Sequence, residues 1–131
     1  MDRGGDDRHA LREALRRLSA GRVIGVFPEG GIRDGERSML EGAPVRDGAV
    51  MLAVHAGRPI VPVVILGSER LYNAKNWLPW RRARVFIAVG KPVFPPDQKS
   101  RGAAREQMRA DLAAAIVRLK DELVALSLIH I

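Results

Sequence analysis

The spacing of apolar positions predicts two helices in the first half of the chain. Residues 7–20 repeat leucine at helical spacing, and Gly21 closes the run after Leu11, Leu15 and Leu18. Residues 48–56 form the second expected helix, which Asp47 caps and which ends at the sequence "GRP". The leucines of the first segment therefore lie on one face of the expected helix.

A third, much longer helix is predicted from Ser100 onward. Apolar side chains recur there every three or four residues, at Met108, Leu112, Ala115, Leu119, Leu123 and Leu126. We interpret this segment as a packing helix with a solvated, basic outer side.

Three short apolar runs predict strands. Residues 23–27, 60–66 and 83–90 are rich in β-branched side chains and show no polar alternation, which is typical of strands buried on both faces. Pro62 cannot donate a hydrogen bond within a ladder, so a bulge or a strand start is expected there. Strands that alternate with helices predict an α/β fold, a layered, mostly parallel sheet flanked by helices.

Composition narrows the function classes. The 131 residues are 47% hydrophobic, so the chain can form one core, and they carry a formal net charge of +7. This charge suits an anionic partner, whether a phosphorylated substrate, an acidic membrane surface or nucleic acid. The chain has no cysteine, which excludes disulfides and thiolate metal sites. No apolar run approaches the roughly 20 residues that a membrane-spanning helix needs.

The stretch "VFPEGGIRDG" carries the candidate chemistry. Pro28 ends an apolar run, Glu29 follows it, and Gly30 and Gly31 let another molecule approach the backbone closely. Ligands of open α/β sheets bind beyond the carboxyl ends of strands, where a carboxylate can orient a hydroxyl. Arg33 could hold phosphate through its planar fork. From these residues alone, a solvated turn is an equally good interpretation.

Two spaced motifs connect this stretch to a known family. "FPEG" at 27–30, followed by "PIVPVVI" at 59–65, resembles the third and fourth sequence blocks of the PlsC-like glycerolipid acyltransferases, the lysophosphatidic acid acyltransferase family. "MDRG" at 1–4 resembles the end of the second block. The similarity extends from Asp2 to about Pro92, and it implies an incomplete glycerol-phosphate acyltransferase domain.

The resemblance assigns roles to individual residues. Arg3 takes the position of an arginine that helps to hold the acceptor phosphate, and Glu29, Gly30 and Arg33 complete the substrate-binding set. Arg33 stands one position later than the family's arginine, because Gly31 and Ile32 follow "FPEG" here. The fourth block implies a donor-side role for Val61 and Pro62. No metal or redox cofactor is implied.

The catalytic pair of the family is missing from this chain. The first block is a histidine and an aspartate separated by four residues, and no histidine here has an aspartate at that spacing. In the family, the histidine deprotonates the acceptor hydroxyl and the aspartate orients the imidazole. We therefore expect an N-terminally truncated fragment without catalytic residues. His9 is expected to be solvated and His55 to be structural.

The last six residues match a sequence that is not expected to belong to the domain. The final "LSLIHI" is what a common sequencing-library transposon adapter encodes when it is read in frame. We expect residues 1–125 to be the C-terminal portion of the domain and residues 126–131 to be adapter read-through.

The resemblance implies transfer of a fatty acyl group to a lysophosphatidate-like hydroxyl in phospholipid biosynthesis. The resemblance implies acyl-CoA or acyl carrier protein as the donor, and a lysophospholipid at the cytoplasmic face of the bacterial inner membrane as the acceptor. The parent would be a peripheral protein there, and the fragment soluble. Trp77 and Trp80, beside Arg81, Arg82 and Arg84, suit an acidic membrane surface. The alternative, a loop folded over the sheet edge with its tryptophans packed, is slightly favoured because two tryptophans in a small domain are usually core.

Two other function classes stay open. The first is a non-catalytic binding module for anionic ligands, either acidic lipid or nucleic acid, although no nucleic-acid motif accompanies the charge and no nucleic acid is expected. The second is a hydrolase that uses Glu29, which would need a second catalytic group nearby.

Overall fold

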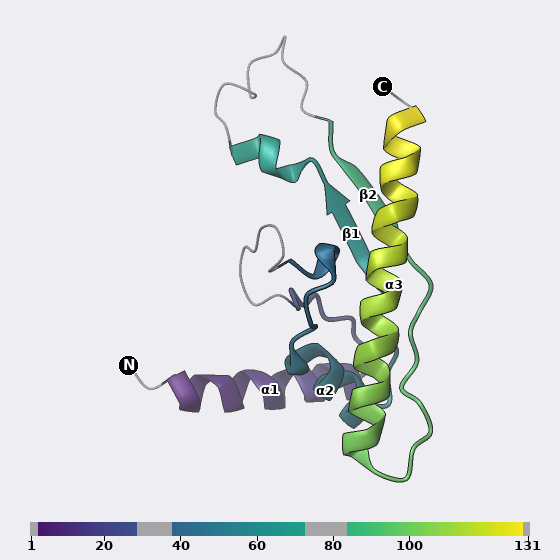
Figure 1. Cartoon of the computed structure of the whole chain (residues 1–131). Coiled ribbons are helices and arrows are strands. Elements are labelled where there is room, and N and C mark those ends of the chain that lie inside the picture. The colour runs from purple at the N-terminus through teal and green to yellow at the C-terminus, as the bar shows by residue number, and fades with distance from the viewer. Residues whose placement is uncertain (1–2, 29–37, 73–83, 130–131) are drawn as a thin grey trace.

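A computed structural model describes residues 3–28, 38–72 and 84–129, and Figure 1 shows their arrangement. The elements follow in the order α1 (Arg3–Ser19), η2 (Met39–Glu41), α2 (Asp47–Ala56), β1 (Val63–Leu66), η3 (Ser68–Tyr72), β2 (Phe86–Val89) and α3 (Arg101–Ile129). The η elements are short 3-10 helices.

Helix α3 organises the core. It runs along one side of the molecule and packs on α2 and η2 and on both strands, while α1 contacts α2 (Figure 1). The side chains of Met108 and Leu112 on α3, together with Val50 on α2, are essentially fully buried. The long apolar stripe of α3 is therefore covered by η2, α2 and β1, which lie far earlier in the chain, as well as by β2.

The three predicted helices are present. Helix α1 begins four residues earlier than expected and ends two residues before Gly21, which has a φ of +76°. Helix α2 begins at Asp47, with Arg46 rather than Asp47 in the N-cap position. In α3 the buried stripe includes Ile116 instead of Ala115, and Leu126 is 54% exposed.

The sheet differs from the prediction. In the described part of the chain it has two strands, which pair antiparallel with Val63 opposite Val89 and Leu66 opposite Phe86. Parallel neighbours need a crossover connection, usually a helix, and the described residues between β1 and β2 contain only the short η3. The expected parallel arrangement is therefore not seen for this pair.

The first predicted strand is wrong. Residues 22–27 have no regular secondary structure, and the side chains of Val23 and Phe27 are 96% and 87% exposed. A strand satisfies its backbone groups only against a neighbour. No strand among the described residues lies beside this segment. β-Branched composition was therefore insufficient to form a strand here.

The other two predicted strands are present but shorter than expected. Strand β1 starts directly after Pro62, as the missing N–H of proline requires, and Ile60 forms an isolated bridge with Val93 before it. Neither strand is buried on both faces. Val64 points toward α3 and is buried, whereas Val63, Ile65, Ile87 and Val89 form an outer face that is 45–66% exposed.

Candidate functional site

The loop that contains the "FPEG" motif is held at both of its described ends. The backbone N–H of Arg46, at the start of α2, donates to the carbonyl oxygen of Pro28 over 3.4 Å. At the other end Ser38 is buried, and its Oγ accepts a hydrogen bond from the N–H of Leu40 over 3.2 Å. Helix α2 and η2 thus fix the points where the motif loop leaves and rejoins the described fold.

Glu29, Gly30 and Arg33 lie outside the described residues. Pro28 directly precedes them, and its contact with Arg46 places the entrance of the motif at the N-terminal end of α2. Arg3, the expected phosphate ligand, is the first residue of α1. The structure therefore locates the backbone of Arg3 and the approach to Glu29, and their predicted roles stay predictions.

The candidate donor-side residues have opposite environments. The side chain of Pro62 is buried, whereas that of Val61 is 47% exposed. The carbonyl oxygen of Pro62 accepts a hydrogen bond from the N–H of Gly90 over 2.8 Å, next to the start of β1. Of the two, only Val61 is accessible to another molecule in the described structure, and Pro62 has a packing role.

The carboxyl end of β1 depends on glycine. Gly67 has a φ of +86°, and a Cβ there would overlap the carbonyl oxygen of Arg84. A residue with a side chain would need a strained backbone as well as a displacement of the segment that leads into β2. Glycine at position 67 therefore lets the end of β1 lie directly against the backbone of Arg84.

Helix α1 carries the perturbed carboxyl group of the described structure. Arg16 Nη2 and Arg17 Nε lie 2.7 and 2.8 Å from Oε1 of Glu13. Hydrogen bonds from Arg16 and Arg17 lower the pKa of Glu13 to about 2, and the same contact with Glu13 raises the pKa of Arg16. These are exposed pairs one helical turn apart, so they stabilise α1 locally and do not form a catalytic carboxylate.

The histidines have no catalytic geometry among the described residues. His9 is exposed, and His55 Nδ1 donates to the carbonyl oxygen of Met51, one turn earlier in α2, over 2.9 Å. His55 borders a small apolar hollow between α1 and α2, lined also by Leu11, Leu15, Met51 and Leu52. The interpretation of His55 as structural agrees with this contact. In the described ranges no group of histidine, cysteine and acidic residues could hold a metal ion.

The expected membrane loop lies mostly outside the described residues. Trp77, Trp80, Arg81 and Arg82 fall within residues 73–83, and only Arg84 is described, with an exposed side chain. Within residues 3–28, 38–72 and 84–129, no helix has both the length and the apolar character needed to cross a membrane.

An ion pair that sequence analysis missed joins α3 to the start of α2. Arg109 Nη2 contacts the carboxylate of Asp47, while Arg109 Nη1 donates to Glu106 over 3.0 Å. The two partners on α3 could be found from their three-residue spacing. The pairing with Asp47 spans 62 positions, and no local pattern signals it.

Comparison with known proteins indicates the family to which the chain belongs. An acyltransferase family model matches residues 1–66, from α1 to the last residue of β1. Comparisons with curated proteins and with solved structures gave no significant match. The matched region contains Arg3, the motif loop and both donor-side candidates, and it covers just over half of the chain. The chain therefore belongs to the acyltransferase family.

Proposed function

We propose that this chain is the C-terminal portion of a glycerolipid acyltransferase. The parent would transfer a fatty acyl group from acyl-CoA or acyl carrier protein to the free hydroxyl of a lysophosphatidate-like acceptor. The observation that carries the proposal is the acyltransferase match over residues 1–66, which includes "FPEG" and "PIVPVV" in the order and spacing of glycerolipid enzymes.

Each site residue has a physical task in this proposal. Arg3 binds the acceptor phosphate through a charge-assisted, forked pair of hydrogen bonds, and Arg33 adds a second cation. Glu29 orients the acceptor through its hydroxyl groups, and Gly30 leaves room for close approach. Val61 and Pro62 lie on the donor side, with Val61 able to contact the acyl donor and Pro62 fixing the start of β1.

The proton-transfer step needs a histidine and an aspartate separated by four residues, and residues 1–125 contain no such pair. In the proposed reaction, a histidine takes the proton of the acceptor hydroxyl as its oxygen attacks the thioester carbon. As the new ester forms, the carbon–sulfur bond breaks, and the thiolate of the donor takes the proton back from the histidine and leaves as the thiol. We place this histidine, with its aspartate, in a preceding segment of the parent. Residues 126–131 are in this view adapter read-through.

The test is an acyl-transfer assay with the purified chain and with the parent protein. Lysophosphatidate and a long-chain acyl-CoA, or acyl carrier protein loaded with the same acyl group, serve as substrates. We expect thiol release and phosphatidate formation with the parent and only the no-protein rate with the chain alone. Acyl transfer by the chain alone would refute the assignment of catalysis to a missing segment. A parent inactive toward every lysophospholipid tested would refute the substrate class and favour the anionic-ligand module.

A further inference from the structure

Among the arginines of α1 and α3 whose side chains the structure describes, five make no ion pair with a described residue: Arg8, Arg12, Arg101, Arg105 and Arg118. The neighbouring arginines of the same helices behave differently. Arg16 and Arg17 share Glu13, and Arg109 contacts Asp47 and Glu106. Internal ion pairing therefore accounts for one set of arginines and leaves the other set without a counterion.

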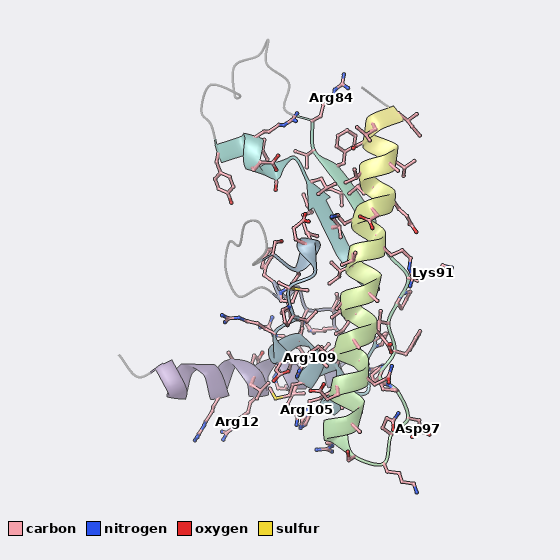
Figure 2. All side chains as sticks on the ribbon, in the orientation of Figure 1. Arg12, Arg84, Lys91, Asp97, Arg105 and Arg109 are labelled. Atoms are coloured by element: carbon pink, nitrogen blue, oxygen red, sulfur yellow. The ribbon has the colours of Figure 1, made fainter. Side chains whose placement is uncertain are left out.

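Four of these five unpaired arginines occur in two pairs at helical spacing, and Arg118 stands apart from them further along α3. Arg8 and Arg12 are four residues apart on α1, and Arg101 and Arg105 are four residues apart on α3, so each pair lies on one side of its helix. Figure 2 shows Arg12 and Arg105 at the same end of the molecule, although they are far apart in the sequence. We call the surface of these four arginines the basic end.

We propose that the basic end is the surface on which this protein docks to an anionic phospholipid bilayer. This inference rests on the proposed function, because the acceptor there is itself a membrane lipid. Like charges without internal partners repel one another, and an array of lipid phosphates relieves that repulsion at several positions at once. Docking at this end also brings α1, which begins with Arg3, to the surface that supplies the acceptor.

The composition of the two helices favours lipid over nucleic acid. Single-stranded nucleic acids are held by aromatic side chains on which bases stack, in addition to cations. Neither α1 nor α3 contains phenylalanine, tyrosine or tryptophan. The basic end thus offers charge without a stacking platform, which suits headgroup phosphates.

The test compares two double variants of the full chain in vesicle co-sedimentation. Arg12→Gln/Arg105→Gln removes two charges from the basic end. Lys91→Gln/Arg118→Gln removes two charges elsewhere: Figure 2 shows Lys91 away from Arg12, and Arg118 lies about 20 Å along α3 from Arg105. Vesicles contain phosphatidylcholine alone or an equal mixture with phosphatidylglycerol. Circular dichroism and thermal melting verify that each variant is folded.

We expect the wild type to bind the anionic vesicles and not the neutral ones. Arg12→Gln/Arg105→Gln should weaken this binding about thirtyfold at low salt, because each basic residue near an acidic surface contributes roughly a factor of five. Lys91→Gln/Arg118→Gln should weaken it by less than about threefold, since its charges lie away from the docked surface. At 1 M salt the Debye length falls to about 3 Å, and the difference between the variants should disappear.

Equal loss in both variants would overturn the proposal in favour of a diffuse net-charge effect, and no loss in either would also overturn it. Tighter binding to single-stranded DNA than to anionic vesicles at the same salt would assign the basic end to nucleic acid instead. The assay contains no acyl donor. A failure of the proposed acyltransferase function would therefore be seen in the acyl-transfer assay, whereas a failure of the docking proposal would be seen in vesicle co-sedimentation.

Discussion

The guanidinium group of Arg109 on α3 contacts the carboxylate of Asp47, the first residue of α2. The carboxylate also lies where a negative charge is favoured by the helix dipole, at the N-terminal end of α2. The Nε of Arg109 is buried with no partner among the described groups, so its side chain is held mainly by the acidic groups that its terminal nitrogens contact. This contact adds to the packing of α2 on α3 and joins the start of α2, next to the Arg46 backbone that holds Pro28, to the longest helix.

Replacing Asp47 by asparagine should reduce the free energy of unfolding by about 1 kcal/mol, from loss of the ion pair and of the dipole interaction. Urea denaturation followed by circular dichroism measures this change. Glu106→Gln is the matched control, because Glu106 contacts the same arginine within one helix and is more exposed. Glu106→Gln should reduce the free energy of unfolding by about 0.2–0.5 kcal/mol. If both variants lowered the free energy of unfolding equally, the ion pair between α2 and α3 would stabilise the fold no more than a pair within one helix.

Gly90→Ala should destabilise the protein by about 1–3 kcal/mol. A Cβ at this position would lie 2.9 Å from Cγ of Pro62 and 3.1 Å from Cδ2 of Leu119, so β1, β2 and α3 would have to separate. Gly48→Ala, on α2, is the control because its Cβ would meet no atom within 4 Å. We expect the control to stabilise the chain by about 0.5–1 kcal/mol through its helix propensity. A neutral Gly90→Ala in chemical denaturation would show that this junction can relax.

Removing residues 126–131 should change the free energy of unfolding by less than about 0.5 kcal/mol, as for surface changes. The side chains of Leu126, Leu128 and Ile129 are 54%, 64% and 75% exposed, whereas Leu123 is 5% exposed. Leu112→Ala, in the core of the same helix, should cost about 2–5 kcal/mol in the same chemical denaturation. A truncation as costly as Leu112→Ala would make these last residues part of the domain and contradict their assignment as read-through.

The pKa of Glu13 should be about 2 in the folded chain, against 4.5 for an unperturbed glutamate, and carboxyl NMR titration measures it directly. The folded-state pKa is depressed, so the stabilisation of α1 by Arg16 and Arg17 is fully present above pH 4.5. It is lost as the pH falls from 4.5 to about 2. In Arg16→Gln/Arg17→Gln the pKa should return toward 4.5. An unchanged low value in that double variant would assign the shift to another cause.

Arg3→Ala and Glu29→Ala should affect the parent enzyme differently. A phosphate contact that is equal in the ground state and the transition state appears in KM, so Arg3→Ala should raise KM for the acceptor at nearly constant kcat. Glu29→Ala should mainly lower kcat, if the carboxylate helps to place the reacting hydroxyl. Steady-state kinetics with lysophosphatidate measure both. Unchanged kinetics in Glu29→Ala would return Glu29 to the role of a solvated turn residue.

The sequence by itself determined the helices and the family. Helical periodicity is local: the spacing of Leu11, Leu15 and Leu18, or of Met108, Leu112 and Leu119, is complete within one segment and does not depend on what covers it. Family membership likewise rests on residue identities and their spacing, and the match over residues 1–66 confirmed that the chain is an acyltransferase family member. Pro62 also indicated an interruption of the ladder, as a bulge or a strand start, because its missing N–H is a property of one residue, and β1 does start directly after it.

The tertiary structure alone decided how the strands pair and which charges meet. A β-branched run forms a strand only where a neighbour accepts and donates its hydrogen bonds, so 23–27 and 63–66 look alike in sequence and differ in the structure. The antiparallel pairing of Val63 with Val89 and the contact of Arg109 with Asp47 join positions 26 and 62 residues apart. Such contacts depend on the path of the whole chain, which no local pattern of residues encodes.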